Sequence, residues 1–151
     1  MDALSFRVFA CLGLILGVAL GSCNPGAEPA AFVALADSTK LAPAPLIIQP
    51  ASPLSANDDE NMVCVQLIAG DTLRDDWAIA VRGGEPARLH AELTLVNGDV
   101  VPLPMESMLG AAQYCLGPRI GGPLRDAVRE ARVWSSAPIT VAGIEWVSTH
   151  K

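Results

Sequence analysis

The clearest alternation of apolar and polar residues in this chain lies between Arg88 and Val96. The apolar positions, which would share one face of a strand, are Leu89, Ala91, Leu93 and Leu95. The polar positions between them are Arg88, His90, Glu92 and Thr94. A period of two predicts a half-buried strand. Asn97-Gly98 then predicts a tight hairpin turn in which both residues take positive φ.

Further short apolar segments predict additional strands. They are Met62–Ile68, Trp77–Arg82, Asp99–Leu103, Ala111–Leu116, Ala131–Trp134, Ile139–Val141 and Ile144–Ser148. The first of these is apolar on both faces apart from Gln66, which favours a central position in a sheet. Pro102 and Pro104 favour an edge position for the strand that returns from the hairpin. Ala142-Gly143 predicts a β-bulge.

These segments together predict an all-β domain, a small antiparallel β-sandwich of the jelly-roll or Ig-like kind, over residues 58–151. The stretch Arg132–Ser148 is similar to the last two strands of jelly-roll modules of the carbohydrate-binding kind. That resemblance implies a fold and leaves the function open. Residues 123–130 stay open between a helix that begins at Pro123 and a strand.

The N-terminus carries an apolar run from Val8 to Leu20, followed by Gly21-Ser22-Cys23. The run is too short for a comfortable bilayer span and has the length of a signal-peptide core. Leu20-Gly21-Ser22-Cys23 resembles the lipobox of bacterial lipoproteins. The resemblance implies a signal peptide over residues 1–22 and a mature chain anchored in a lipid bilayer through two acyl chains, palmitate among them, on Cys23. By the same analogy, Asn24 favours the outer membrane over the inner membrane.

Residues 23–57 are rich in Pro, Ala and Ser, with few charges. This composition predicts a disordered, extended tether that holds the domain away from the membrane. Two apolar islands interrupt it, Phe32–Leu35 and Leu46–Ile48. The sequence leaves open whether Leu46–Ile48 pairs with the domain as an edge strand or contacts a partner.

The chain has 151 residues and a formal net charge of −6, with 10 Lys and Arg against 16 Asp and Glu. This balance argues against a nucleic-acid partner, because phosphate binding needs clustered basic residues. Of the four cysteines, Cys11 lies in the signal and Cys23 would be acylated. Cys64 and Cys115 remain, and an even pair in an exported chain predicts a disulfide. No metal ligand set is apparent at ligand spacing from either cysteine.

Trp77, Trp134 and Trp146 are the main candidates for a binding site. Exposed aromatics on a sandwich stack on sugar rings or anchor a protein partner. We expect Trp146 in the core, Trp134 partly exposed, and Trp77 at a loop edge beside Asp75 and Asp76 as the best ligand candidate.

The acidic cluster of Asp71, Asp75 and Asp76 is interpreted as a solvated turn, with a calcium-binding loop as the alternative. His90 and His150 are interpreted as solvated surface residues. No nucleophile motif, metal motif or cofactor motif accompanies them. We therefore expect a non-catalytic envelope module without a cofactor, which binds another envelope protein or assembly. The alternatives are a module that binds polysaccharide or peptidoglycan through Trp77 and Trp134, and a hydrolase that uses the acidic cluster.

Overall fold

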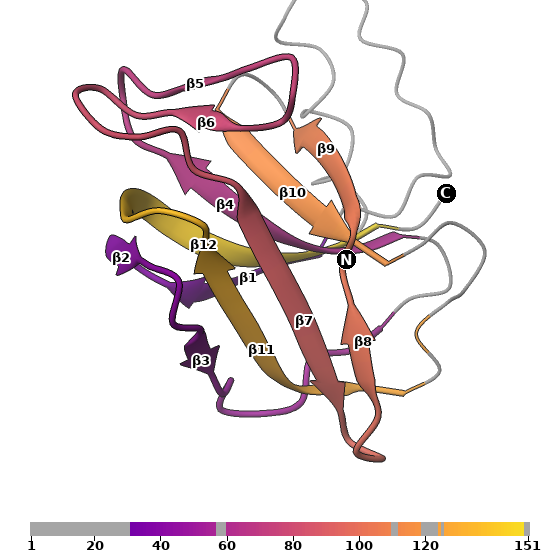
Figure 1. The fold of residues 1–151 in the computed structure, drawn as a ribbon. Coiled ribbons are helices and arrows are strands. Elements are labelled where there is room, and N and C mark those ends of the chain that lie inside the picture. Colours follow the sequence, from indigo (N-terminus) through magenta and orange to yellow (C-terminus); the bar gives the residue numbers. More distant parts are fainter. Residues whose placement is uncertain (1–30, 57–59, 110–111, 119–123, 125, 150–151) are drawn as a thin grey trace, which may run out of the picture.

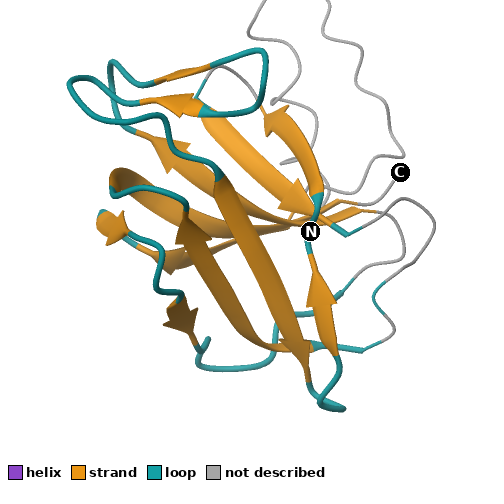
Figure 2. Cartoon of the chain, viewed as in Figure 1, coloured by secondary structure: helices purple, strands orange, loops and turns teal. Residues whose placement is uncertain are grey.

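The computed structural model describes residues 31–56, 60–109, 112–118, 124 and 126–149. These residues form strands joined by loops and turns (Figure 2), and they contain no helix. The strands are β1 (Ala31–Ala36), β2 (Thr39–Leu41), β3 (Leu46–Ile48), β4 (Glu60–Leu67), β5 (Thr72–Leu73), β6 (Ile79–Ala80), β7 (Leu89–Leu95), β8 (Val100–Pro102), β9 (Met105–Leu109), β10 (Gln113–Gly117), β11 (Val128–Ser135) and β12 (Ile139–Thr149). The predicted all-β class is confirmed.

Two antiparallel sheets pack against each other (Figure 1). Sheet A has the order β1-β12-β4-β10-β9, and β2 also pairs with β12. Sheet B has the order β3-β11-β7-β8, and β5 with β6 forms a separate small hairpin. Without β2, β5, β6 and β9, eight strands remain, which can be counted from one to eight along the chain. The order in sheet A is then one, eight, three, six, and the order in sheet B is two, seven, four, five. This alternation between sheets is the jelly-roll arrangement, one of the two sandwich types that the sequence predicted.

The alternating pattern of β7 places its apolar residues in the core between the sheets. Leu89, Leu93 and Leu95 are buried, while His90 on the opposite face is exposed. Thr94 departs from the expectation, because it is buried although it lies on the polar face. Large side chains of sheet A, among them Trp146, complete the core from the other side.

The hairpin after β7 differs from the prediction in its backbone. Gly98 has φ 95°, but Asn97 is not among the residues with positive φ. The Gly98 N–H donates to the Leu95 carbonyl at 3.0 Å, and the Leu95 N–H donates to the Asp99 carbonyl at 2.8 Å. The loop is therefore a three-residue turn with one left-handed residue, rather than a two-residue turn with two.

Several other expectations are confirmed. β4 lies between β12 and β10, as its apolar character on both faces predicted. β8, which contains Pro102, lies at an edge of sheet B. The pairing of β12 with β4 shifts register between Val141 and Gly143, which is the predicted bulge. The choice between helix and strand for residues 123–130 is settled in part, because β11 begins at Val128.

The expected boundary at residue 58 is wrong. β1 and β2 pair with β12, and β3 pairs with β11, so residues 31–48 belong to the sandwich and not to a tether. Composition misled the prediction, because the strands here are short and apolar, and the Pro and Ser residues that dominate the average lie in the turns between them. Leu46–Ile48 does pair with the domain as an edge strand, which was one of the two alternatives.

Two further segments differ from the prediction. Trp77–Arg82 is reduced to β6, because Trp77 has φ 61°, a value that ends an extended strand. β9 was missed, because Met105–Leu109 lacks alternation and follows a proline.

Among the residues that the structure describes, there is no helix with the length and apolar character needed to cross a bilayer. The expected signal peptide, Cys23, Asn24 and His150 lie outside the described residues.

Candidate functional site

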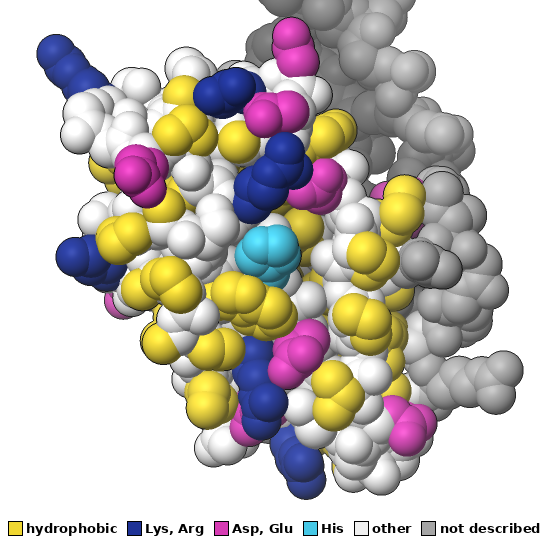
Figure 3. Space-filling view, in the orientation of Figure 1, with side chains coloured by type: hydrophobic (Ala, Val, Ile, Leu, Met, Phe, Trp, Pro, Cys, Tyr) yellow, Lys and Arg dark blue, Asp and Glu magenta, His cyan; other side chains and the backbone are white. Residues whose placement is uncertain are grey.

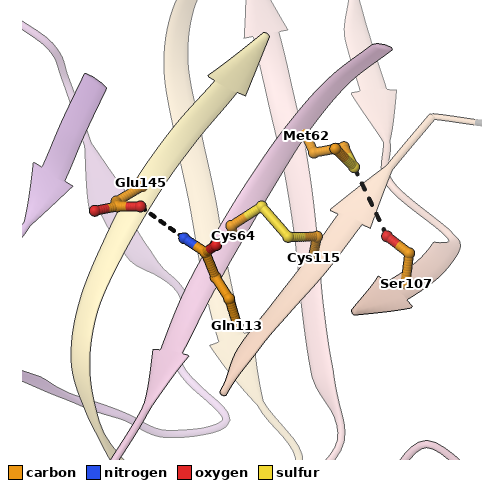
Figure 4. The surroundings of a disulfide bond; sticks show 6 residues. All are labelled: Met62, Cys64, Ser107, Gln113, Cys115 and Glu145. Atoms are coloured by element: carbon orange, nitrogen blue, oxygen red, sulfur yellow. Dashed lines mark hydrogen bonds between the residues drawn. A yellow bond between two sulfur atoms is a disulfide. The ribbon is translucent and has the colours of Figure 1, made fainter. Parts of the chain in front are cut away.

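The predicted disulfide is present. Cys64 on β4 and Cys115 on β10 lie directly opposite each other and form a bond across the two strands (Figure 4). Their side chains lie on the outer face of sheet A, in a small buried cluster with Met62 and Val147. The two cysteines are 51 residues apart in sequence. The cross-link would therefore stabilise the folded state by about 4 kcal/mol, because it restricts the conformations of the unfolded chain.

Polar contacts flank the disulfide on this face. The Ser107 hydroxyl donates to the Met62 sulfur at 3.7 Å, and the Gln113 amide donates to Glu145 at 2.7 Å (Figure 4). The contact of Gln113 with Glu145 spans β4, since these residues belong to β10 and β12. The disulfide region therefore serves to hold the middle strands of sheet A together.

The three tryptophans occupy three different environments. Trp146 is buried in the core, as predicted, and its indole N–H donates to the Ser55 carbonyl at 3.3 Å. Trp134 is partly exposed on the outer face of sheet B, also as predicted. Trp77 lies in the β5–β6 loop and packs partly against the core. The structure therefore does not bring Trp77 and Trp134 into one aromatic site.

Trp134 stacks on His90 at the centre of the outer face of sheet B. The two residues lie opposite each other on β11 and β7, with ring centroids 5.5 Å apart and planes inclined by 22°. His90 was interpreted as a solvated surface residue. It is exposed, and its ring lies against the indole in an offset stack. The pair is a fixed aromatic unit rather than two independent side chains.

A chain of charged hydrogen bonds lies beside the aromatic pair. Arg132 donates to Glu130 at 2.8 Å and to Glu92 at 3.2 Å. The Gln49 amide donates to the other oxygen of Glu130 at 3.0 Å. The hydrogen bond from Gln49, followed by that from Arg132, lowers the pKa of Glu130. The hydrogen bond to Glu130 raises the pKa of Arg132.

Apolar side chains complete this outer face. Ile47 on β3 lies opposite Arg132 and is 55% exposed, and Val100 on β8 lies opposite Thr94 and is also 55% exposed. Figure 3 looks onto this face and shows hydrophobic side chains gathered around the histidine, with charges of both signs between them. We call the residues Ile47, Gln49, His90, Glu92, Val100, Glu130, Arg132 and Trp134 the sheet B face.

The acidic loop lies at one end of the sandwich. Asp76 forms ion pairs with Arg74 at 3.3 Å and with Arg88 at 3.4 Å. Because Arg88 lies two residues before His90, this pair links the loop to the end of the sheet B face. Asp75 is exposed, and Asp71 accepts a hydrogen bond from the Arg82 N–H at 3.4 Å.

Trp77 is held from the core side. Its ring meets the Tyr114 ring edge-to-face at 6.0 Å, and the Tyr114 hydroxyl donates to Glu106 at 2.6 Å. Burial, followed by that hydrogen bond, raises the pKa of Tyr114. Within the described ranges, no three His, Cys, Asp or Glu side chains group in a way that could hold a metal ion.

Of the sheet B face, the sequence named only Trp134 as a candidate site residue. Ile47 and Gln49 belong to the segment that composition assigned to the tether. The apolar island Leu46–Ile48 was the signal that could have placed them on the domain. No family model, no curated protein and no solved structure matches this chain.

Proposed function

We propose that this protein is a lipid-anchored envelope module that binds another envelope protein through the sheet B face. The observation that carries the proposal is the composition of that face. A tryptophan and an arginine lie at its centre, exposed Ile47 and Val100 lie at its sides, and charged groups are interspersed. Protein interfaces are enriched in Trp and Arg at the centre, with polar groups at the rim.

The charged groups of the face favour binding over catalysis. Glu92, Glu130 and Arg132 are held by one another, so their side chains are fixed before a partner arrives. Preorganised side chains reduce the entropy that is lost on association. A carboxyl that acts as a general acid near neutral pH needs a raised pKa, whereas the pKa of Glu130 is lowered.

A polysaccharide ligand is the second candidate. The exposed part of Trp134 lies beside the planar polar groups of Arg132 and Glu92, and such groups hydrogen-bond sugar hydroxyls. The stacking of His90 on the indole favours the protein partner, because the imidazole lies against one of the two ring faces and narrows the access of a sugar ring to that face.

The anchor belongs to the same proposal and rests on the sequence Leu20-Gly21-Ser22-Cys23. Acylation of Cys23 by two chains would give stable membrane attachment. Replacement of this cysteine in Cys23→Ala should move the protein from the membrane fraction to the soluble fraction of the envelope and abolish labelling by radioactive palmitate. Retention of both properties would refute the anchor without affecting the assignment of the binding face.

Site-specific photo-cross-linking in intact bacterial cells tests the binding face. A photoreactive residue at Ile47 or Val100 should give a discrete cross-linked product with one protein. The same residue at Gln66, which is exposed on β4 of sheet A, should not. Trp134→Ala should reduce the yield at both sheet B positions. Equal products from Gln66 and Ile47, or none from any position, would refute the proposed protein-binding face.

The polysaccharide candidate is separated by co-sedimentation of the purified chain with cell-wall material. Saturable co-sedimentation that is lost in Trp134→Ala, without a protein cross-link in cells, would favour the sugar ligand. The matched control is Trp77→Ala, since that indole lies in the β5–β6 loop and packs toward Tyr114.

A further inference from the structure

The edges of the two sheets are protected unequally against pairing with another chain. Unpaired strand edges invite such pairing, and proteins usually blunt them with short strands, proline, lysine or inward-pointing charges. β3 has three residues between Pro45 and Pro50, and β8 contains Pro102. β9 contains Glu106, which reaches inward to Tyr114, and β2 contains exposed Lys40. Each of these four edges therefore carries a recognised protective device.

β1 carries none of these devices, and the register shift in its pairing with β12 is confined to its C-terminal end, between Ala34 and Ala36. Its six residues, Ala-Phe-Val-Ala-Leu-Ala, include no charge and no proline. It pairs with β12 on one side and ends sheet A on the other, where no strand of the described part of the chain follows. Phe32 is 58% exposed and Val33 is 40% exposed. This is the combination that favours addition of another strand.

A groove of about 580 Å³ runs beside this edge. It lies between β1 and the segment 49–55, with Trp146 and Ser148 also in its lining. Val33 lines the groove and lies opposite buried Trp146, so a side chain added next to Val33 would enter the groove from the core side of sheet A. The lining residues include no charged side chain. A strand that pairs here must therefore present small or apolar, uncharged residues to the groove.

We propose that the β1 edge pairs with β1 of a second copy of this chain, in antiparallel register about a two-fold axis. The β1 sequence has the uncharged, small and apolar character that the groove requires. In such a pair the residues that lie opposite each other point to the same face of the sheet. The axis must then pass through a residue rather than between two residues, because only such registers keep inward residues opposite inward residues. Axes through Val33 or Ala34 pair the largest part of β1. The interface is self-complementary, as a two-fold contact requires.

The position of β1 in the chain favours a second copy over an unrelated strand. β1 begins at Ala31, and the eight residues from Cys23 can span at most about 30 Å. Copies anchored in one membrane would thus carry their β1 edges at a similar height, and their confinement to one surface raises the effective concentration for pairing. This argument rests on the proposed acylation, whereas the pairing chemistry of the edge does not.

The test is the mass of the purified full chain in a mild detergent, measured by sedimentation, for Ala34→Lys against Ala34→Thr. Ala34 is exposed and lies opposite Glu145 of β12, so a lysine there can be tolerated within the sheet. The two-fold axis would place two lysines close together across the new interface. We expect a dimer for the unaltered chain and for Ala34→Thr. For Ala34→Lys we expect a monomer that keeps the circular dichroism spectrum of the folded chain.

Cysteine cross-linking gives a second readout that does not depend on detergent. Val33→Cys or Ala34→Cys should form a disulfide-linked dimer in chains reconstituted on phospholipid vesicles. Val100→Cys, at the exposed edge strand of sheet B, should not. A monomeric unaltered chain that also fails to cross-link at both β1 positions would overturn the proposal, and so would a dimer that survives Ala34→Lys. The photo-cross-links at Ile47 and Val100 would be unaffected by Ala34→Lys, so failure here is distinguishable from failure of the sheet B face.

Discussion

Two hairpin loops of this protein have the same backbone design and different residues at its most demanding position. In one, the N–H of Leu95 donates to the Asp99 carbonyl and that of Gly98 donates to the Leu95 carbonyl. In the other, the N–H of Arg74 donates to the Ala78 carbonyl at 2.9 Å, and that of Trp77 donates to the Arg74 carbonyl at 3.0 Å. The left-handed position is taken by glycine in the first loop and by tryptophan in the second, with φ values of 95° and 61°.

The difference shows which interactions determine the backbone conformation of each loop. Glycine adopts positive φ without a steric penalty, and nothing lies within 4 Å of the place where a Cβ would stand at Gly98. A left-handed tryptophan costs about 1–2 kcal/mol. That cost is offset by tertiary contacts, because the indole packs against Tyr114, whose hydroxyl is held by Glu106. The first loop is specified locally, and the second is specified by the core.

Removal of the indole should have the largest effect. Trp77→Ala keeps the steric cost of a Cβ at positive φ and loses the packing on Tyr114. Full truncation of a core tryptophan costs about 3–5 kcal/mol, and Trp77 is partly exposed, so we expect a loss of about 2–3 kcal/mol in the free energy of unfolding. Urea unfolding followed by circular dichroism measures it. Trp134→Ala, on the sheet B face, is the control, and a larger loss there would contradict the assignment of Trp77 as the structural anchor.

The same comparison explains how far the sequence predicts this fold. Leu89–Leu95 and the Gly98 turn were visible because alternation and glycine are local signals. The β5–β6 hairpin was not visible as such, because no local signal marks Trp77 as left-handed, and its apolar neighbours were interpreted as a longer strand. The conformation depends on Tyr114, 37 residues away in the sequence.

The candidate site follows the same rule. The partly exposed Trp134 and the buried Trp146 follow from patterns within single segments. The disulfide of Cys64 with Cys115 follows from the count of cysteines that remain after Cys11 and Cys23 are assigned. The sheet B face as a whole does not, because Gln49 and Glu130 are 81 residues apart. Their pairing depends on β3 joining β11, and the composition of the surrounding segment indicated a tether instead of a strand.

Alkaline pH should weaken the hairpin that Tyr114 anchors. The raised pKa of Tyr114 means that the folded state keeps its proton above pH 10, where the unfolded chain releases it. The stabilising effect is complete below the unfolded pKa near 10 and is lost as pH rises toward the folded pKa, at up to about 1.4 kcal/mol per pH unit. The free energy of unfolding should therefore fall more steeply for the unaltered chain than for Tyr114→Phe.

The chain offers a direct readout for this prediction, because Tyr114 is its only tyrosine. Near pH 10 the folded protein should show no tyrosinate absorbance, whereas the unfolded chain in urea should show about half of the full signal, and nearly all of it at about pH 11. A folded protein that titrates with a midpoint near 10 would contradict the burial of the hydroxyl. Two parallel stability curves for the unaltered chain and Tyr114→Phe would do the same.

Gly98→Ala should reveal the steric cost of a Cβ at positive φ, which Trp77 also has in the β5–β6 loop. The added Cβ meets no neighbour, so the effect comes from positive φ alone, and we expect a loss of about 1 kcal/mol. Thermal unfolding against the unaltered chain measures it. Asn97→Ala is the control for the turn. It keeps glycine at the position of positive φ and removes the hydrogen bond that the Asn97 side chain accepts from the Asp99 N–H. A neutral Gly98→Ala would mean that the turn changes its geometry without penalty.

The smallest effect should come from the difference between two variants of the same residue. Trp77→Gly and Trp77→Ala both lose the indole, but only alanine keeps a Cβ at φ 61°. Glycine also gains more freedom in the unfolded chain, which opposes the relief of strain. We expect Trp77→Gly to be more stable than Trp77→Ala by about 0.5–1 kcal/mol, the reverse of the usual order of these residues within a strand. If alanine were the more stable variant, the loop without its indole would no longer hold the left-handed turn, and the hairpin itself, not only its anchor, would depend on Trp77.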